Sequence, residues 1–337
     1  MSMTSVKIND AIAKRFGLAD GTVSYNTAMN DAASGVGFMI SQLAYLETQM
    51  YAVDYADLFF DRVVPITTGI PEWADNVNYI SYNSAARGKF IGSHAKDLPS
   101  VSVERQIHNA NIAYGGLSLT YSLDDLRKAQ HLGMNLDAEQ AVMANRAARE
   151  HQQRVVFYGD AERELRGFLN NPLVSKANST LSIATATVEK LADEINTYIS
   201  EIWTNSNQRY LPNTVCIESA LYAKLSTQRM TDTAQVMSAL QYLSQFNLYR
   251  DQTGQNLQII PMPQLSAANL KAEGLEEKSM MVVYDKSDRN LASWMPIAPR
   301  FIAPQAVALE IITPMEYKFS GTEWRYPNSA MYVQFAA

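Results

Sequence analysis

The spacing of hydrophobic residues predicts an α/β unit in the second half of the chain. Apolar side chains recur at helical spacing from residue 188 to residue 203, which predicts an amphipathic helix. Short apolar runs at Thr214–Ile217 and Met280–Tyr284 predict buried strands. A further strand at 257–260 and helices at 219–225 and 234–246 complete the pattern, so residues 187–300 are predicted to alternate helix and strand.

A long helix is predicted before this unit, over about residues 137–158, ending at Gly159. Its length would be about 33 Å at 1.5 Å per residue. Its apolar stripe is narrow and made of small residues, so we expect it to lie across a sheet rather than to form the centre of a core.

The segment before the long helix alternates apolar and polar residues over 100–121, which predicts a pair of strands, with Gly115-Gly116 permitting a bulge or kink. A short helix is predicted over 122–133. The C-terminal tail returns to strands at 306–312, 315–319 and 331–335. We expect these to complete the sheet that begins near Ser100, which makes residues 187–300 an insertion and the fold class α+β.

Residues 62–100 form an unusually long stretch without helical periodicity, although many of them are apolar and strand-forming. A two-stranded excursion cannot bury such residues by itself, so we predict that a neighbouring subunit covers it. Candidate inter-subunit contacts are Trp73, Arg87, Lys89, Phe90 and Lys96. Residues 1–61, rich in small polar residues at the start, are predicted to form an arm.

Composition favours an assembling protein. The chain of 337 residues is 47% hydrophobic and only 18% charged, which excludes intrinsic disorder and a coiled coil. Its 18 Tyr and 15 Met fit a surface buried against other subunits. A net charge of -6 without a basic block predicts only weak, non-specific contact with nucleic acid. The chain has no apolar run long enough for a membrane span, which predicts no membrane contact. Its start does not resemble a secretory signal, which predicts assembly in a cytoplasm.

No motif predicts catalysis, a cofactor or a metal site. The four histidines, His94, His108, His131 and His151, are scattered without a partner at metal-ligand spacing. No phosphate-binding loop or nucleophile elbow is present, and the single Cys216 lies in an apolar run that would make it inert. We therefore predict no catalytic residue and no enzyme activity. Lys89 or Lys96 could form a covalent link to a neighbour's asparagine, but salt bridges or solvent exposure are the commoner outcome for such lysines, so we do not expect a crosslink.

The order of these parts resembles a known family. The segments that carry the resemblance are Tyr121-Ser122-Leu123-Asp124-Asp125-Leu126-Arg127-Lys128-Ala129, Phe157-Tyr158-Gly159-Asp160, Gly167-Phe168-Leu169-Asn170-Asn171-Pro172 and Arg325-Tyr326-Pro327. Together with the loop, the long helix and the strand-rich tail, they are similar to the major capsid proteins of tailed bacteriophages, which have the Johnson fold shared with encapsulin shells.

The resemblance implies five parts: an N-terminal arm (1–61), an extended loop (62–100), a peripheral domain (101–186) with a spine helix over about 137–158, an axial domain (187–300) and C-terminal strands of the peripheral domain (301–337). It implies a homo-oligomer of pentamers and hexamers in an icosahedral virion capsid around double-stranded DNA, assembled in the host bacterial cytoplasm. Portal, scaffold or decoration proteins are the implied partners. The arm is too short for a fused scaffolding domain, and a chain starting at Met1 argues against proteolytic maturation.

Three alternatives remain. An encapsulin-like compartment would use the same fold around a protein cargo. A cytosolic α/β enzyme would have no way to bury residues 62–100. Another virion component such as a portal or decoration protein is a third alternative, although a portal would need longer helices and a ring-forming stem that the sequence does not predict.

Overall fold

The structure is a computed structural model that describes residues 3–7, 22–26, 58–85, 102–122, 124, 136–230 and 237–336. The chain divides into two units, Met1–Ala56 and Asp57–Ala337. In the first unit, strands β1 (Met3–Lys7) and β2 (Thr22–Asn26) form an antiparallel pair. The sequence pattern predicted only an arm there.

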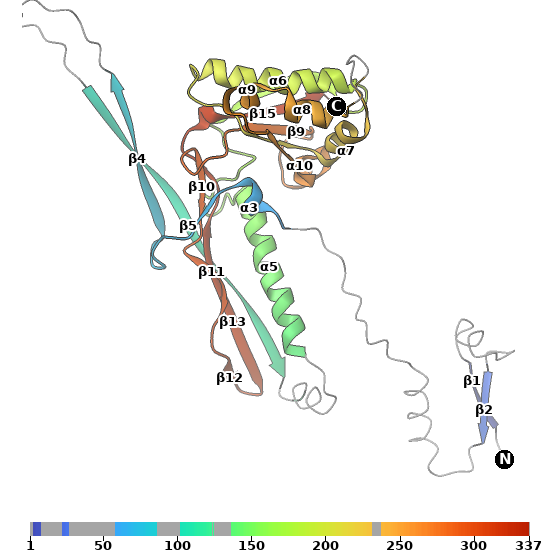
Figure 1. Ribbon diagram of the computed structural model, residues 1–337. Coiled ribbons are helices and arrows are strands. Elements are labelled where there is room, and N and C mark those ends of the chain that lie inside the picture. The colour runs from blue at the N-terminus through green and yellow to red at the C-terminus, as the bar shows by residue number, and fades with distance from the viewer. Residues whose placement is uncertain are drawn as a thin grey trace, which may run out of the picture. The chain divides into compact units, whose positions relative to one another are not determined.

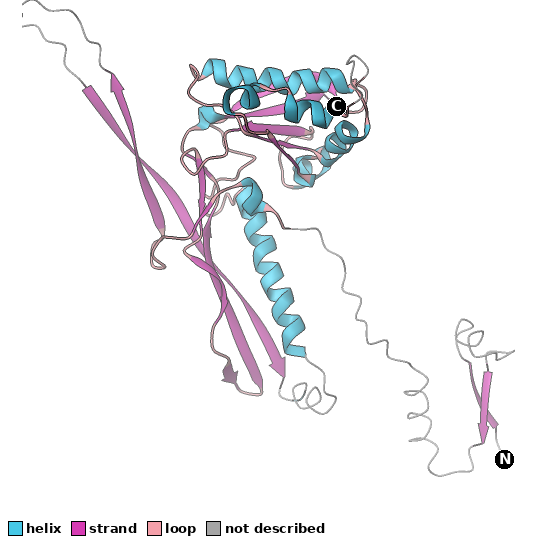
Figure 2. Cartoon of the chain, viewed as in Figure 1, coloured by secondary structure: helices cyan, strands magenta, loops and turns pink. Residues whose placement is uncertain are grey.

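The second unit is an α+β fold, as predicted, and its described strands form three sheets (Figure 2). One five-stranded sheet has the order β11 (Ile297–Phe301), β13 (Glu310–Ser320), β5 (Ser102–Ser122), β4 (Asn76–Ala85), and β12 (Gln305–Val307) also pairs with β13. The other has the order β6 (Ser175–Ser182), β15 (Ala330–Ala336), β9 (Met280–Tyr284), β7 (Thr214–Ile217), β8 (Gln258–Pro261). A three-stranded sheet joins β14 (Glu323–Trp324), β10 (Leu291–Trp294) and β3 (Ile66–Thr67).

Helix α5 (Leu136–Tyr158) confirms the predicted spine helix and lies alongside β5 and β13 (Figure 1). Its buried side chains along the sheet are small, Ala144, Ala148 and Val155, which lets the helix approach the sheet closely. Short helix α3 (Phe60–Val63) packs near the C-terminal end of α5, where Val63 and Val156 belong to one core cluster.

The end of α5 is fixed by a tight backbone junction. Gly159 has φ +73°, and a Cβ there would collide with the carbonyl oxygen of Leu165. The next segment turns back, so that the N–H groups of Phe168 and Leu169 donate to the last carbonyls of the helix at 2.9 Å each. The two glycine-containing motifs singled out in the sequence therefore meet in space and end the helix together.

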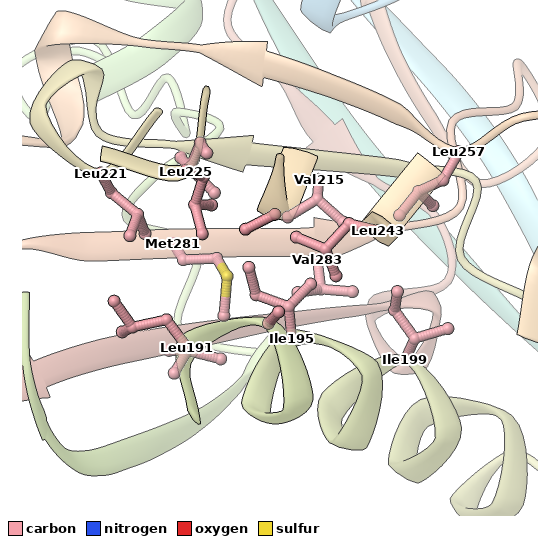
Figure 3. Packing of buried hydrophobic residues seen from close by; sticks show 14 of the residues in the cluster. Leu191, Ile195, Ile199, Val215, Leu221, Leu225, Leu243, Leu257, Met281 and Val283 are labelled. Atoms are coloured by element: carbon pink, nitrogen blue, oxygen red, sulfur yellow. The ribbon is translucent and has the colours of Figure 1, made fainter. Parts of the chain in front are cut away.

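Helix α6 (Val188–Asn205) confirms the predicted amphipathic helix and covers the sheet that contains β9 and β7 (Figure 3). Leu191, Ile195 and Ile199 point toward Val215, Met281 and Val283 of those strands, and all are essentially buried. Around this core lie α7 (Ser219–Thr227), α8 (Ala239–Gln245) and α9 (Leu248–Thr253), with α10 (Ala267–Ala272) and the short 3-10 turns Pro263–Leu265 and Pro327–Ser329 elsewhere in the unit. The predicted helix over 234–246 is thus shorter, and residues 231–236 lie outside the described part.

Two sequence expectations are wrong. The segment expected to form a strand pair over 100–121 does not do so, because residues 102–121 belong to the single strand β5. Gly115 lies within this strand and makes room for the ring of Tyr317, with which a Cβ would collide. The last tail strand does not join the sheet that begins near Ser100. β15 lies between β6 and β9 in the other sheet, where six of its seven residues are buried.

Several predicted features cannot be placed. The short helix expected over 122–133 lies outside the described residues, apart from Ser122 and Asp124. Residues 86–100 of the extended loop expected over 62–100 also lie outside the described residues. In the part of the chain that is described, the helices lack the combination of length and apolarity that a membrane crossing requires.

Candidate assembly interface

A two-stranded ribbon, made of β4 and residues 102–111 of β5, projects from the second unit (Figure 1). The strands are antiparallel, with Asn76 opposite Asn111 at the base and Ala85 opposite Ser102 at the far end. Figure 1 shows the ribbon projecting away from the helices and the remaining strands of the unit. An isolated hairpin of this kind has only marginal stability in water, so it needs another surface to pack on.

One face of the ribbon carries an exposed apolar cluster, next to asparagines nearer the base, Asn76, Asn78, Asn109 and Asn111. Ile80 and Ile107 are paired directly across the strands and are 50% and 72% exposed, and Tyr82 is 65% exposed. These positions share a face because side chains alternate along a strand. The Arg105 guanidinium lies 5.7 Å from the centre of the Tyr82 ring and extends this face. Such an exposed apolar cluster is typical of a surface that binds another protein.

The opposite face is covered only near the base. Val77, Tyr79 and the buried Ala110 pack there against Ala292 and Trp294 of β10. Because β10 belongs to the three-stranded sheet, this contact joins the ribbon to the centre of the unit. The two faces of the ribbon therefore differ: one holds the ribbon at its base and the other is free.

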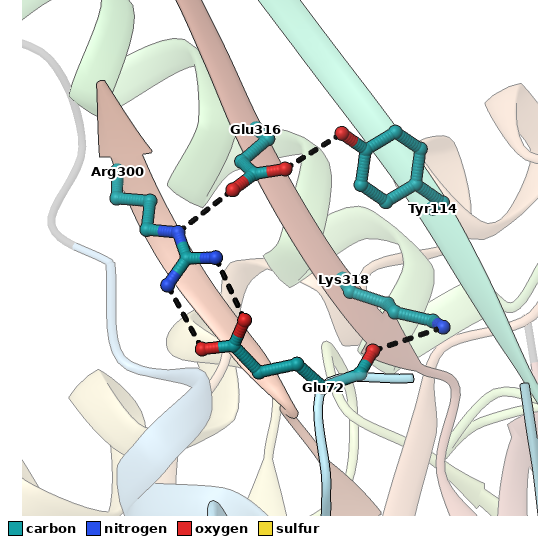
Figure 4. A network of polar contacts seen from close by, with 5 residues as sticks. All are labelled: Glu72, Tyr114, Arg300, Glu316 and Lys318. Atoms are coloured by element: carbon teal, nitrogen blue, oxygen red, sulfur yellow. Dashed lines mark hydrogen bonds and ion pairs between the residues drawn. The ribbon is translucent and has the colours of Figure 1, made fainter. Parts of the chain in front are cut away.

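A polar network fastens the turn that leads into the ribbon (Figure 4). Two guanidinium nitrogens of Arg300 donate to both carboxylate oxygens of Glu72 at 2.8 Å, and its Nε donates to Glu316 at 2.7 Å. The Tyr114 hydroxyl donates to the other oxygen of Glu316 at 2.7 Å, and Lys318 donates to Asp75 at 2.7 Å. The network thus ties residues 72–75 to β11, β13 and β5.

The charges of this network shift the pKa values of its members. The hydrogen bond from Arg300 lowers the pKa of Glu72, and the hydrogen bonds from Tyr114 and Arg300 lower that of Glu316. The bond to Glu316 raises the pKa of Tyr114. At neutral pH both carboxylates are therefore ionised and paired with Arg300, which gives the turn a bidentate attachment.

Of the predicted contact residues, the structure places only Trp73. It lies in the turn before the ribbon and is 82% exposed, as a contact residue in an unassembled subunit would be. Arg87, Lys89, Phe90 and Lys96 lie outside the described residues. The prediction did not single out Ile80, Tyr82 and Ile107. Ile80 and Tyr82 are two residues apart and therefore share a face of β4, which the sequence could have indicated. That Ile107 lies on the same face follows only from the register between β4 and β5.

The described cysteine and histidine side chains, which could in principle act in catalysis or bind a metal, are buried or contact other side chains. Cys216 is fully buried, and burial raises the pKa of its thiol to about 12. His108 stacks on Tyr79 with ring centres 4.9 Å apart, and His151 Nδ1 lies 3.0 Å from the Tyr317 hydroxyl. His94 and His131 lie outside the described residues. Among those described, no three His, Cys, Asp or Glu side chains gather as metal ligands would.

A cavity of about 850 Å³ lies where the end of α5 meets the ribbon base. Two ion pairs line it, Arg154 with Glu273 at 2.9 Å and Arg166 with Glu323 at 3.1 Å. Both pairs join segments far apart in the sequence. The charged groups of these pairs thus neutralise each other across the cavity walls.

Comparison with known structures identifies the fold. The capsid protein of the Myoviridae phage XM1 matches with a TM-score of 0.74 at 11% identity, over 88% of this chain and 98% of that chain. A chain of Mycobacterium phage Ogopogo matches with a TM-score of 0.56 at 12% identity, over 92% and 100%. A virus-like particle from Pyrococcus furiosus matches with a TM-score of 0.51 at 13% identity, over 81% and 90%. These matches show the Johnson fold.

Sequence comparison identifies the family. No curated protein matches the chain. The family profile described as major capsid protein, however, matches residues 86–335, which include β5, the spine helix and the strands of both five-stranded sheets except β4 and the last residue of β15. This match favours a capsid over an encapsulin-like compartment. The chain belongs to the major capsid protein family.

Proposed function

We propose that the chain is the structural subunit of an icosahedral shell that encloses the double-stranded DNA of a tailed bacteriophage. The observation that carries the proposal is the ribbon, whose apolar cluster at Ile80, Tyr82 and Ile107 is exposed and is not covered by the described residues of the subunit. In the proposed shell, each ribbon lies on a neighbouring subunit. The fold is then completed only on assembly, and many such contacts add up to a closed shell.

The proposed shell divides each subunit into working parts. Residues 62–100 form the extended loop, 101–186 with 301–337 the peripheral domain, and 187–300 the axial domain, which meets its copies in pentamers and hexamers. The strand pairing supports a close mechanical link between these domains, because β15 of the tail is an inner strand of the sheet that α6 covers. A force on the peripheral part would be transmitted directly to the axial part.

The proposed contacts with other components follow from charge. With a net charge of -6, the inner wall would touch packaged DNA weakly and without sequence preference. The subunit would act without catalysis or a cofactor. A portal would fill one vertex, and scaffold or decoration proteins are further proposed partners. Assembly would take place in the host cytoplasm.

The proposal is tested by expressing the full chain alone and imaging the product by electron microscopy. Closed shells or capsomer rings are the expected result. Native particles are then examined by their absorbance at 260 and 280 nm. A nucleic-acid spectrum supports the phage capsid, whereas shells filled with a protein cargo would support the compartment alternative. A compact monomer at high concentration would contradict both.

A further inference from the structure

Strand β5 changes partner at the base of the ribbon. Residues 102–111 pair with β4, and residues 112–122 pair with β13 on the other edge of β5. No described residue of β5 therefore pairs with both neighbours. The junction is reinforced by one further backbone bond, from the N–H of Ile112 to the carbonyl of Asp75 at 2.8 Å. A sheet without a three-stranded overlap resists bending poorly, so the ladder alone does not fix the direction of the ribbon.

Side chains at the base supply the missing restraint, and Tyr79 is central among them. Its hydroxyl donates to Glu323 Oε1 at 3.0 Å, and its ring stacks on His108 across the ribbon. The Arg325 guanidinium lies 6.0 Å from the Tyr79 ring and 5.4 Å from the Trp294 ring. It therefore contacts both the ribbon and the rest of the second unit, which we call the body. Tyr79 is therefore attached by its hydroxyl and by its ring.

The acceptor of the Tyr79 bond is held firmly by the body. Glu323 lies in β14, its side chain is 9% exposed, and Arg166 donates to the same oxygen at 3.1 Å. Burial and the neighbouring Glu323 carboxylate raise the pKa of Tyr79, so the hydroxyl keeps its proton and remains a donor. The bond thus connects a ribbon residue to a fixed point of the body.

Beyond Tyr79 the described contacts stay inside the ribbon. Ser81 Oγ bonds His108 Nε2 at 2.8 Å, and Arg105 covers Tyr82. Below Tyr79, the side-chain bond from Asn111 to Glu164 is long, at 3.4 Å, and lies at the junction itself. Among the described residues of the ribbon, Tyr79 is therefore the one whose side-chain hydrogen bond to the body lies away from residues 111–112, where β5 changes partner.

We propose that Tyr79 and Glu323 form a latch that sets the direction of the ribbon, and that the ribbon turns about residues 111–112 of β5 when the latch opens. Tyr79 is a positioning residue in this scheme. A latched ribbon would present its apolar cluster in one direction before a second subunit arrives. The latch is a property of the single chain, so it does not rest on the proposed shell.

The test variant is Tyr79→Phe, which removes only the hydroxyl and leaves the stacked ring and the Arg166–Glu323 pair. The matched control is Tyr114→Phe. Tyr114 also lies in a strand of the same sheet and also donates its hydroxyl to a carboxylate, but it lies where β5 pairs with β13, outside the ribbon. Tyr114→Phe leaves the Arg300 bonds to Glu72 and Glu316 in place, so the turn that leads into the ribbon stays fastened. Both variants lose the same chemical group, so a difference between them reports on position.

Ribbon direction is measured as the distance between spin labels at Gln106→Cys in the ribbon and Lys190→Cys on α6, both exposed positions. The buried Cys216 does not compete for the label. Pulsed electron spin resonance is recorded on full-length free subunits, separated from any particles by size-exclusion chromatography. Circular dichroism and the unfolding midpoint check that each variant is folded. Hydrogen exchange of the β5 amides near residue 112 gives a second, label-free readout.

For Tyr79→Phe we expect a broader distance distribution, with the ratio of displaced to latched ribbons raised about tenfold, which corresponds to ~1.4 kcal/mol. We also expect faster exchange near residue 112. Tyr114→Phe should match the parent in both measurements. If Tyr79→Phe gives the parent's distribution and exchange, or if Tyr114→Phe broadens the distribution equally, the latch is overturned. Either result is independent of whether shells form.

Discussion

Ile80 of β4 and Ile107 of β5 are paired directly across the ribbon, and both side chains face solvent, 50% and 72% exposed. A cross-strand pair of large aliphatic residues normally faces a core. Here no part of the described subunit covers it. The pair is therefore the clearest mark of a surface that is completed by a second molecule.

Replacing this pair should impair assembly while sparing the subunit. Burying a partly exposed Ile contributes about 1 kcal/mol, so Ile80→Ser with Ile107→Ser should raise the concentration at which particles form by at least about tenfold. Light scattering across a concentration series measures this threshold. The unfolding midpoint of the free subunit should stay the same, since neither side chain is packed in it.

The control for that experiment is Val142→Ser. Val142 lies on α5, away from the ribbon, and is 66% exposed. We expect it to change the assembly threshold much less than the double ribbon variant. Equal effects of the two variants would mean that general surface hydrophobicity, rather than the ribbon, drives association.

Two glycines offer a matched test of the junction at the end of the spine helix. Gly159 and Gly254 both have φ +73°, but only at Gly159 would a Cβ meet backbone atoms, whereas Gly254 has open space around it. Gly254→Ala should cost only about 1 kcal/mol of left-handed strain. Gly159→Ala should cost about 3 kcal/mol or more in the free energy of unfolding, because helix and turn must move apart.

Urea denaturation of the free subunit measures both costs. A Gly159→Ala variant as stable as Gly254→Ala would show that the segment after the helix yields easily. It would then not be the rigid junction described above.

The buried thiol predicts a pattern of chemical reactivity. Because burial raises the pKa of Cys216 to about 12, almost no thiolate exists at neutral pH, and reagents have no access to the sulfur. Folded protein should therefore react with a thiol reagent at pH 8 at least about a hundredfold more slowly than protein in 6 M guanidinium, where the ordinary pKa of ~8.5 applies. Labelling followed by mass spectrometry measures the rate. Rapid labelling of the native chain would contradict the assigned position.

The ion pairs of Arg300 with Glu72 and Glu316 predict that the stability of the subunit depends on acid pH. The folded-state pKa values of Glu72 and Glu316 are lowered, so their contribution to stability is present above the unfolded carboxylate pKa, ~4.3, and is lost as the pH falls through the lowered values. The unfolding midpoint of Arg300→Gln should therefore lie below that of the parent at pH 7. The difference should shrink as the pH falls below about 4.

A midpoint difference that stays constant from pH 7 to pH 3 would contradict this assignment. Arg250→Gln provides the control. The Arg250 guanidinium donates to the neutral side-chain amide of Asn256 at 3.0 Å, so no carboxylate is lost with it. The midpoint difference of Arg250→Gln should therefore stay the same as the pH falls.

Elements whose side chains follow one clear period could be predicted from the sequence. Helix α6 and strands β7 and β9 lie where their apolar patterns placed them, because each buries its whole apolar face within its own sheet and helix layer. The spine helix was also predictable, since a glycine must follow it at Gly159.

The pairing of distant strands could not be predicted in the same way. β6 is a polar segment, Ser175–Ser182, and its strand conformation comes from its parallel ladder with β15. β15 is apolar on both faces and fits either sheet until the position of β9 is known. Local pattern does not reveal that Gly115 makes room for a ring from β13 rather than ending a strand.

The account rests on the claim that another subunit covers the ribbon. The most direct measurement is a cryo-electron microscopy map of the assembled particle at side-chain resolution. We predict that Ile80, Tyr82 and Ile107 lie against a neighbouring copy of the chain and are buried there. A closed particle in which these three side chains still face solvent would contradict the account.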